Sequence, residues 1–162
     1  MAKDLIPREY IDELRAAQAA LHKAAPSRPI DERRTAQSRF HWALKAIWYP
    51  GLCEAVWLGS PEGTELRIRF LEQDPWFFRS GYAKQRAIKT LKREDLSDKQ
   101  LARLRKVCLA AVDGHDRTEF RDYCRLAQRV QDQDLVEALK TRRHSPDEGI
   151  RRRASWMLER LR

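Results

Sequence analysis

The stretch that decides the fold is residues 145–162, SPDEGIRRRASWMLERLR. Its apolar residues recur every three or four positions, as they do along one face of a helix: Ile150, Ala154, Met157, Leu158 and Leu161. Ser145 can cap such a helix and Pro146 suits a first turn, so a helix is predicted to begin here. Because only one side is apolar, this helix needs neighbouring helices to cover it.

The same helix start, an apolar residue followed by arginine and then a small or aromatic residue three positions on, occurs twice upstream. It reads Phe120-Arg121 with Cys124, and Phe78-Arg79 with Tyr82. Further helices are predicted at 8–24, 31–49 and 77–93, after capping boxes that begin at Ser97 and Asp116, and from Asp134. The predicted fold is all-α, with antiparallel helical hairpins stacked into a short α-solenoid.

Residues 134–162 resemble a HEAT repeat, whose second helix follows a turn aspartate and carries isoleucine or valine, arginine, alanine and two leucines. Here these residues are Asp147, Ile150, Arg151, Ala154, Leu158 and Leu161. Weaker copies cover 64–93 and 98–131, where Arg86 and Gln128 replace expected leucines. The resemblance implies a scaffold that presents a binding surface, with some members binding DNA. It also implies that Arg79, Arg121 and Arg151 bridge to aspartates in adjacent turns.

The chain is predicted to form one helical domain over 1–162 with three parts. Residues 1–25 hold a helix that either packs or moves as an arm, 26–63 are rich in aromatic residues, and 64–162 form three HEAT-like hairpins. Within 64–72, apolar Leu66, Ile68 and Phe70 alternate with arginines, which alone favours a strand and a small β-hairpin at 53–71. An isolated hairpin is marginal in water, so helix is the preferred interpretation.

The charge of the chain is strongly positive, with 33 Lys and Arg against 24 Asp and Glu and a formal net charge of +9. Such a field favours partners with a negative surface. The N-terminus has no apolar signal segment and no apolar run is long enough to span a membrane, so a cytoplasmic protein is expected.

Most of the excess positive charge lies between residues 79 and 106, where there are ten basic and three acidic residues. We interpret this segment as a basic hairpin and a surface for anions, the alternative being an ordinary solvated exterior. Its candidate binding residues are Lys84, Arg86, Lys89, Lys92, Arg93, Lys99, Arg103 and Lys106.

A second basic group recurs every four residues along one predicted helix: Arg117, Arg121, Arg125 and Arg129. It is either a binding ridge for phosphate or carboxylate groups or a solvated side that pairs with Asp122, Asp132 and Asp134. Trp156 lies off the apolar stripe, four residues from both Arg152 and Arg160. These three residues are predicted either to stack on a ligand or to cover a neighbouring helix or an oligomer interface.

The largest apolar group is aromatic, and it is expected to form core with an exposed remainder available for docking. Its members are Phe40, Trp42, Trp48, Tyr49, Trp57, Trp76, Phe77 and Phe78.

No catalytic, cofactor or metal motif is present in the sequence. Cys53, Cys108 and Cys124 are an odd number without Cys-x-x-Cys spacing, so buried free thiols are expected. The loop from Asp113 to Asp116 holds titratable groups but no adjacent nucleophile. We therefore expect a non-catalytic adaptor that binds an acidic protein through its basic surface. The alternative is direct binding of DNA or RNA by the same surface, and the oligomeric state is left open.

Overall fold

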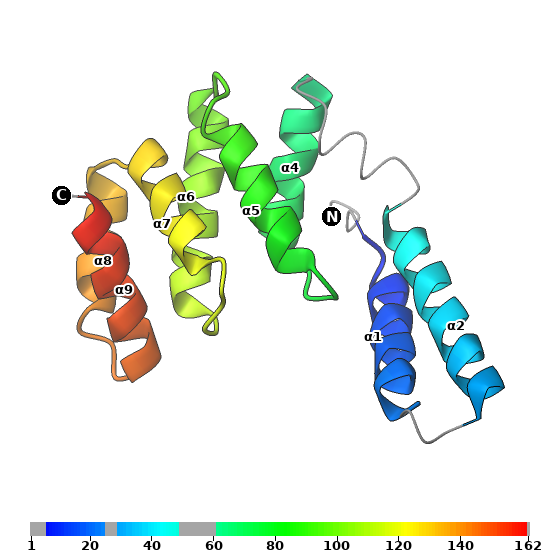
Figure 1. The fold of residues 1–162 in the computed structure, drawn as a ribbon. Helices are drawn as coiled ribbons and strands as arrows, with labels where there is room; N and C mark the ends of the chain where they lie inside the picture. Colours follow the sequence, from blue (N-terminus) through cyan, green and yellow to red (C-terminus); the bar gives the residue numbers. More distant parts are fainter. Residues whose placement is uncertain (1–5, 25–28, 49–60, 162) are drawn as a thin grey trace. The chain divides into compact units, whose positions relative to one another are not determined.

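The computed structural model describes residues 6–24, 29–48 and 61–161. All regular structure in these ranges is α-helical, which confirms the predicted all-α class (Figure 1). The helices are α1 (Arg8–Lys23), α2 (Ile30–Trp48), α4 (Pro61–Gln73), α5 (Ser80–Leu91), α6 (Asp98–Asp113), α7 (Phe120–Val130), α8 (Gln133–Arg142) and α9 (Glu148–Leu161).

The β-hairpin alternative is wrong where the structure describes it, because α4 covers 61–73; residues 53–60 lie outside the described ranges. Ile68, Phe70 and Leu71 are buried together with Arg67. Strict alternation would have placed Arg67 opposite Ile68 and in solvent. Burial of neighbouring positions requires the helical spacing instead.

The contacts divide the chain into two compact units, Met1–Ser80 and Gly81–Arg162, which we describe separately. In the first unit, α1 and α2 pack against each other through Leu14, Ala17 and Phe40, among other buried residues. Gln73 at the end of α4 exchanges two hydrogen bonds with the backbone of Ile6, at 3.0 and 2.6 Å.

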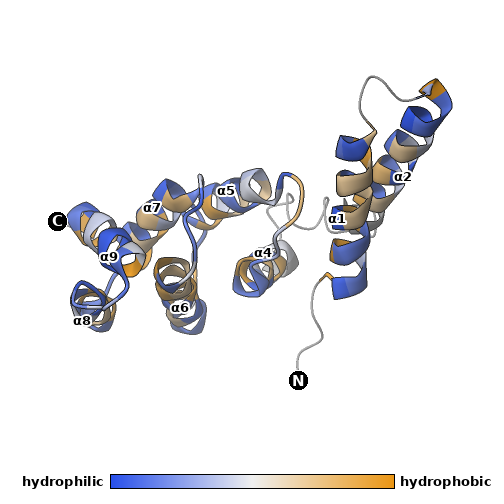
Figure 2. Ribbon diagram, turned by 90° about the horizontal axis from the view of Figure 1, so that it is seen from below, coloured by the Kyte–Doolittle hydropathy of each residue, from blue (hydrophilic) through white to orange (hydrophobic). Residues whose placement is uncertain are grey.

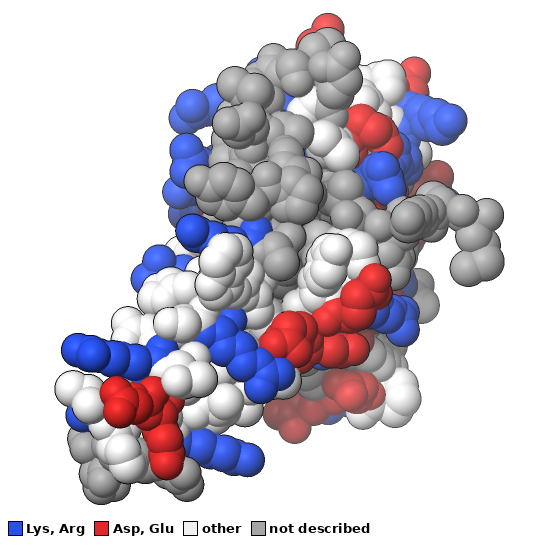
Figure 3. All heavy atoms as spheres, turned by 90° about the vertical axis from the view of Figure 1, so that its right-hand side faces the viewer, with Lys and Arg blue, Asp and Glu red and all other residues white. Residues whose placement is uncertain are grey.

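Charges of both signs lie side by side on the N-terminal unit. Figure 3, seen from the side of α1 and α2, shows basic and acidic atoms interspersed. Arg39 of α2 donates two hydrogen bonds to the Glu13 carboxylate of α1, at 2.8 and 3.1 Å. This pairing lowers the pKa of Glu13 and raises that of Arg39. On the side that Figure 3 shows, the charges of the described residues are therefore mixed in sign.

The predicted aromatic cluster is divided between core and surface. Phe40 and Phe77 are buried, and Phe40 meets Phe78 edge to face with ring centroids 5.1 Å apart. Trp42 and Trp76 are exposed. Tyr49 and Trp57 lie outside the described residues, as does the side chain of Trp48.

The second unit has two layers of helices. Helices α6 and α7 pack as one hairpin and α8 and α9 as the next, while α7 also contacts α9 and α6 contacts α8. Figure 2 shows α5, α7 and α9 in one row and α6 and α8 in the other. Leu104, Cys108, Leu126, Leu139 and Met157 fill the space between the rows. Helices that follow one another in the chain therefore belong to alternate layers, and each exposes its polar side on the outside of its own layer.

Candidate docking surface

The exposed side of the α5–α7–α9 layer is strongly basic. We call it the basic face and define it by Arg86, Lys89, Arg93, Arg121, Arg125, Arg129, Arg152 and Arg160, all of which are exposed. On α5, α7 and α9 the exposed carboxylates are Glu148 and Glu159, because Asp122 is buried; Asp95 is also exposed, two residues after Arg93 in the turn beyond α5. Apolar side chains on the inner side of each helix orient these basic residues outward.

The basic residues predicted at 79–106 do not share one surface. Residues of α5 belong to the basic face, whereas Lys99, Arg103 and Lys106 are on α6 in the other layer. The segment is therefore not a hairpin: α6 pairs with α7. Lys92 is half-buried just beyond the end of α5.

Lys84 is a correction to the predicted surface, because it is only 1% exposed. Its Nζ lies 3.9 Å from the Glu119 carboxylate, which is itself buried just before α7. A buried ammonium ion needs such a partner, since its desolvation is costly. Lys84 therefore joins α5 to the start of α7 and is not available to a ligand.

The predicted arginine ridge is partly a set of structural contacts. Arg117 is half-buried in the turn before α7, with its guanidinium 5.4 Å from the centre of the Tyr123 ring. Arg125 pairs with Asp122 at 3.0 Å. Arg121 and Arg129 are exposed, and no carboxylate among the described residues pairs with them. Asp132 pairs with Arg105 at 2.9 Å, not with the ridge.

A groove of about 610 Å³ lies between α7 and α9 on the basic face. Four predicted binding residues meet there: Arg117, Arg121, Trp156 and Arg160. Phe120 and Cys124 contribute apolar surface, and Thr118 and Glu159 complete the lining. The groove thus combines three arginines, one glutamate and two aromatic rings.

Trp156 is held at the groove by two neighbours. The Arg152 guanidinium lies 5.4 Å from the centre of its ring, and Phe120 stands beside it at 6.3 Å with the ring planes tilted by 52°. Trp156 remains 49% exposed. The indole is therefore fixed in position while much of its surface stays open.

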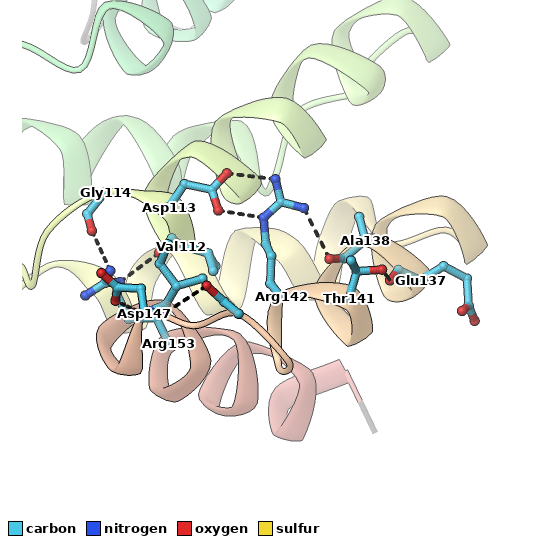
Figure 4. A network of polar contacts seen from close by, with 11 residues as sticks. Val112, Asp113, Gly114, Glu137, Ala138, Thr141, Arg142, Asp147 and Arg153 are labelled. Carbon is cyan, nitrogen blue, oxygen red and sulfur yellow. Dashed lines mark hydrogen bonds and ion pairs between the residues drawn. The ribbon is translucent and has the colours of Figure 1, made fainter.

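A polar network ties the turn after α6 to α9, and the sequence did not predict it. Arg153 is buried and donates to the Val112 carbonyl at 2.8 Å, to the Gly114 carbonyl and to the Asp116 carboxylate at 2.7 Å. Figure 4 shows its guanidinium beside that turn. Gly149 leaves room for it, since a Cβ there would lie 2.9 Å from Arg153 Nη1.

The predicted capping box at Asp116 is wrong. Glu119 precedes α7 without a side-chain capping hydrogen bond, and Asp116 instead accepts hydrogen bonds from Arg152 and Arg153. The capping box at Ser97 is confirmed, because the side chains of Ser97 and Gln100 each accept a hydrogen bond from the other residue's backbone N–H. An acidic residue in a turn is satisfied as well by a distant arginine as by a local amide.

Two further arginines join one helix to the end of another in the same way. Arg142 of α8 donates two hydrogen bonds of 2.7 Å to Asp113 at the end of α6 (Figure 4), which raise the pKa of Arg142. Arg105 of α6 donates to the Val130 carbonyl at 2.7 Å and pairs with Asp132, which caps α8. These contacts fix the ends of α6, α7 and α8 relative to one another.

The network makes stability sensitive to acid. Hydrogen bonds from Arg153 and then Arg152 hold the pKa of Asp116 below its usual value of 3.8. Asp116 therefore stabilises the fold above that value, and its contribution is lost as pH falls through the lower folded pKa. We expect Asp116→Asn to destabilise the protein near neutral pH and to lose less stability than wild type below about pH 4. Urea unfolding across this range measures the difference.

The described thiols are free and buried. Burial raises the pKa of Cys124, which lines the groove, to about 11, although Arg160 opposes the shift. Burial also raises the pKa of Cys108. Cys124 is therefore mainly protonated near neutral pH and a weak nucleophile. Cys53 lies outside the described residues.

Comparison with protein families, with curated proteins and with solved structures finds no match. Among residues 6–24, 29–48 and 61–161, no helix has the length and apolar character needed to cross a membrane. Over the same residues, no cluster of three or more His, Cys, Asp and Glu side chains suits a metal ion.

Proposed function

We propose that this protein is a non-catalytic, HEAT-like adaptor that binds an acidic protein partner through its basic face. The observation that carries the proposal is the set of exposed basic residues without a carboxylate partner among the described residues: Lys89, Arg93, Arg121, Arg129 and Arg160. Like charges four residues apart on one helix, as Arg121, Arg125 and Arg129 are on α7, repel one another, and an acidic partner relieves that repulsion.

The layered fold supports this function. Hairpins that stack through their apolar sides leave one side of each helix free, so neighbouring helices add up to a continuous outer surface. The arginine contacts at Asp113, Asp116 and Asp132 fix the turns between these helices. A rigid surface loses little conformational entropy when a partner binds.

The proposal is tested by reversing charge on one layer at a time. The variant Lys89→Glu/Arg93→Glu/Arg129→Glu alters the basic face. The control variant Lys99→Glu/Lys106→Glu/Arg143→Glu changes the net charge by the same amount, but Lys99 and Lys106 lie on α6 and Arg143 follows α8. The probe is a fluorescent poly-glutamate peptide, with binding followed by anisotropy. We expect the first variant to bind about tenfold more weakly than wild type, since each exposed pair contributes roughly 0.2–1 kcal/mol.

The control variant is expected to keep most of the affinity. Equal losses in the two variants would show that only net charge matters and would contradict a defined face. Binding of a single-stranded oligonucleotide is measured in parallel, to test the alternative that the basic face binds nucleic acid. Tight oligonucleotide binding that weakens steeply with salt, together with no peptide binding, would replace the protein-partner proposal.

A further inference from the structure

The groove between α7 and α9 has a composition that the rest of the basic face lacks. Phe120 is only 5% exposed and lies beside the half-exposed Trp156, and the exposed Arg121 and Arg160 line the same groove. An apolar surface surrounded by arginines suits a ligand that is apolar at its centre and acidic around it.

We propose that this groove holds a short acidic segment of the partner protein in which one apolar or aromatic side chain lies between carboxylates. The proposal rests on the proposed function and adds where the partner docks and what chemistry is recognised. The apolar side chain lies against Phe120 and Trp156, and the flanking carboxylates pair with Arg121 and Arg160.

The charges of the groove favour carboxylates. Arg121 and Arg160 have no ion-pair partner among the described residues, and guanidinium groups bind carboxylates through two parallel hydrogen bonds. Arg117 adds a third positive charge at the turn before α7. Glu159 is the one acidic residue of the lining, so the net charge of the groove is positive.

The aromatic geometry favours a peptide side chain over a nucleobase. A base binds by stacking on an open aromatic face. Arg152 already lies over the Trp156 ring, and Phe120 stands tilted beside it. Trp156 is still 49% exposed, and its indole beside Phe120 suits an aliphatic or aromatic side chain.

The groove is organised before a ligand binds. Asp116 is hydrogen-bonded to both Arg152 and Arg153, and Arg152 in turn lies over Trp156. Arg153 connects the same carboxylate to the turn after α6. Because these contacts already order the indole, little further entropy is lost when a side chain lies against it.

The test compares two fluorescent peptides on the full chain: poly-glutamate with one central phenylalanine, and the same peptide with alanine there. We expect the phenylalanine peptide to bind about tenfold more tightly, because one aromatic side chain is buried. Trp156→Ala is expected to abolish this preference. The matched control Trp42→Ala removes a tryptophan that is 72% exposed in the N-terminal unit, and the preference should persist.

A second variant separates ligand binding from folding. Arg160→Glu keeps the apolar surface and is expected to weaken both peptides several-fold without changing the midpoint of urea unfolding. Equal affinity for the two peptides in wild type, with weaker binding after charge reversal on the basic face, overturns the groove proposal and leaves the proposed function intact. If neither peptide binds, both proposals fail.

Discussion

Glu119→Ala is expected to lower the free energy of unfolding by about 3–5 kcal/mol, because it removes a carboxylate that lies 3.9 Å from the buried Lys84 ammonium. The side chains of this ion pair are 1% and 7% exposed, so water cannot replace the missing partner. Thr118 also loses the oxygen atom to which its hydroxyl donates at 3.3 Å. Urea unfolding followed by circular dichroism measures the loss.

Two controls distinguish burial of charge from loss of an ion pair in general. Glu137 pairs with Lys140 at 2.8 Å but is 58% exposed, so Glu137→Ala is expected to cost less than about 1 kcal/mol. The double variant Lys84→Met/Glu119→Leu removes both charges and should recover most of the loss. A large loss at Glu137, or none at Glu119, would contradict the assigned burial.

Arg153→Ala is expected to cost about 2–4 kcal/mol, because three acceptors at the end of α6 and in the turn after it lose a charged donor. Two of these acceptors are backbone carbonyls, of Val112 and Gly114. Arg153→Met retains the length of the side chain without its donors and should be nearly as unstable. The neighbouring Arg152→Ala is the matched control, since Arg152 is 42% exposed and makes its ion pair in solvent.

An Arg153→Ala protein as stable as Arg152→Ala would show that the network adds nothing beyond a surface ion pair. Thermal unfolding gives an independent measure, because a loss of this size also lowers the midpoint temperature by several degrees.

The helices were predictable because apolar spacing and local capping act over short distances. Leu104, Val107, Cys108 and Ala111 recur at helical spacing and are buried, and the Ser97–Gln100 box forms as expected. Residues 64–72 were harder because arginines interrupt the apolar run. The decisive fact there, that Arg67 is buried, cannot be recognised from the local pattern of apolar and charged residues.

The site was only partly predictable, because it depends on how helices pack against one another. Trp156 was predicted to act with Arg152 and Arg160, and Arg121 was assigned to the separate arginine ridge. That Arg121, Trp156 and Arg160 line one groove depends on how α7 packs against α9. The aspartate bridge that was predicted for Arg151 is made instead by Arg153, which bonds Asp116. Arg151 donates hydrogen bonds to the Ser145 and Pro146 carbonyls in the turn just before its own helix. Lys84 and Arg86 look alike in the sequence, yet one is buried and the other exposed.

The contacts of Arg142 with Asp113 and of Arg153 with Asp116 both run from the α8–α9 hairpin back to the end of α6 and the turn after it. Separation of the last hairpin would therefore strip donors from the one before it, in addition to uncovering apolar surface. Such interfacial coupling raises the cooperativity of a repeat array, so neighbouring repeats melt together instead of fraying from one end.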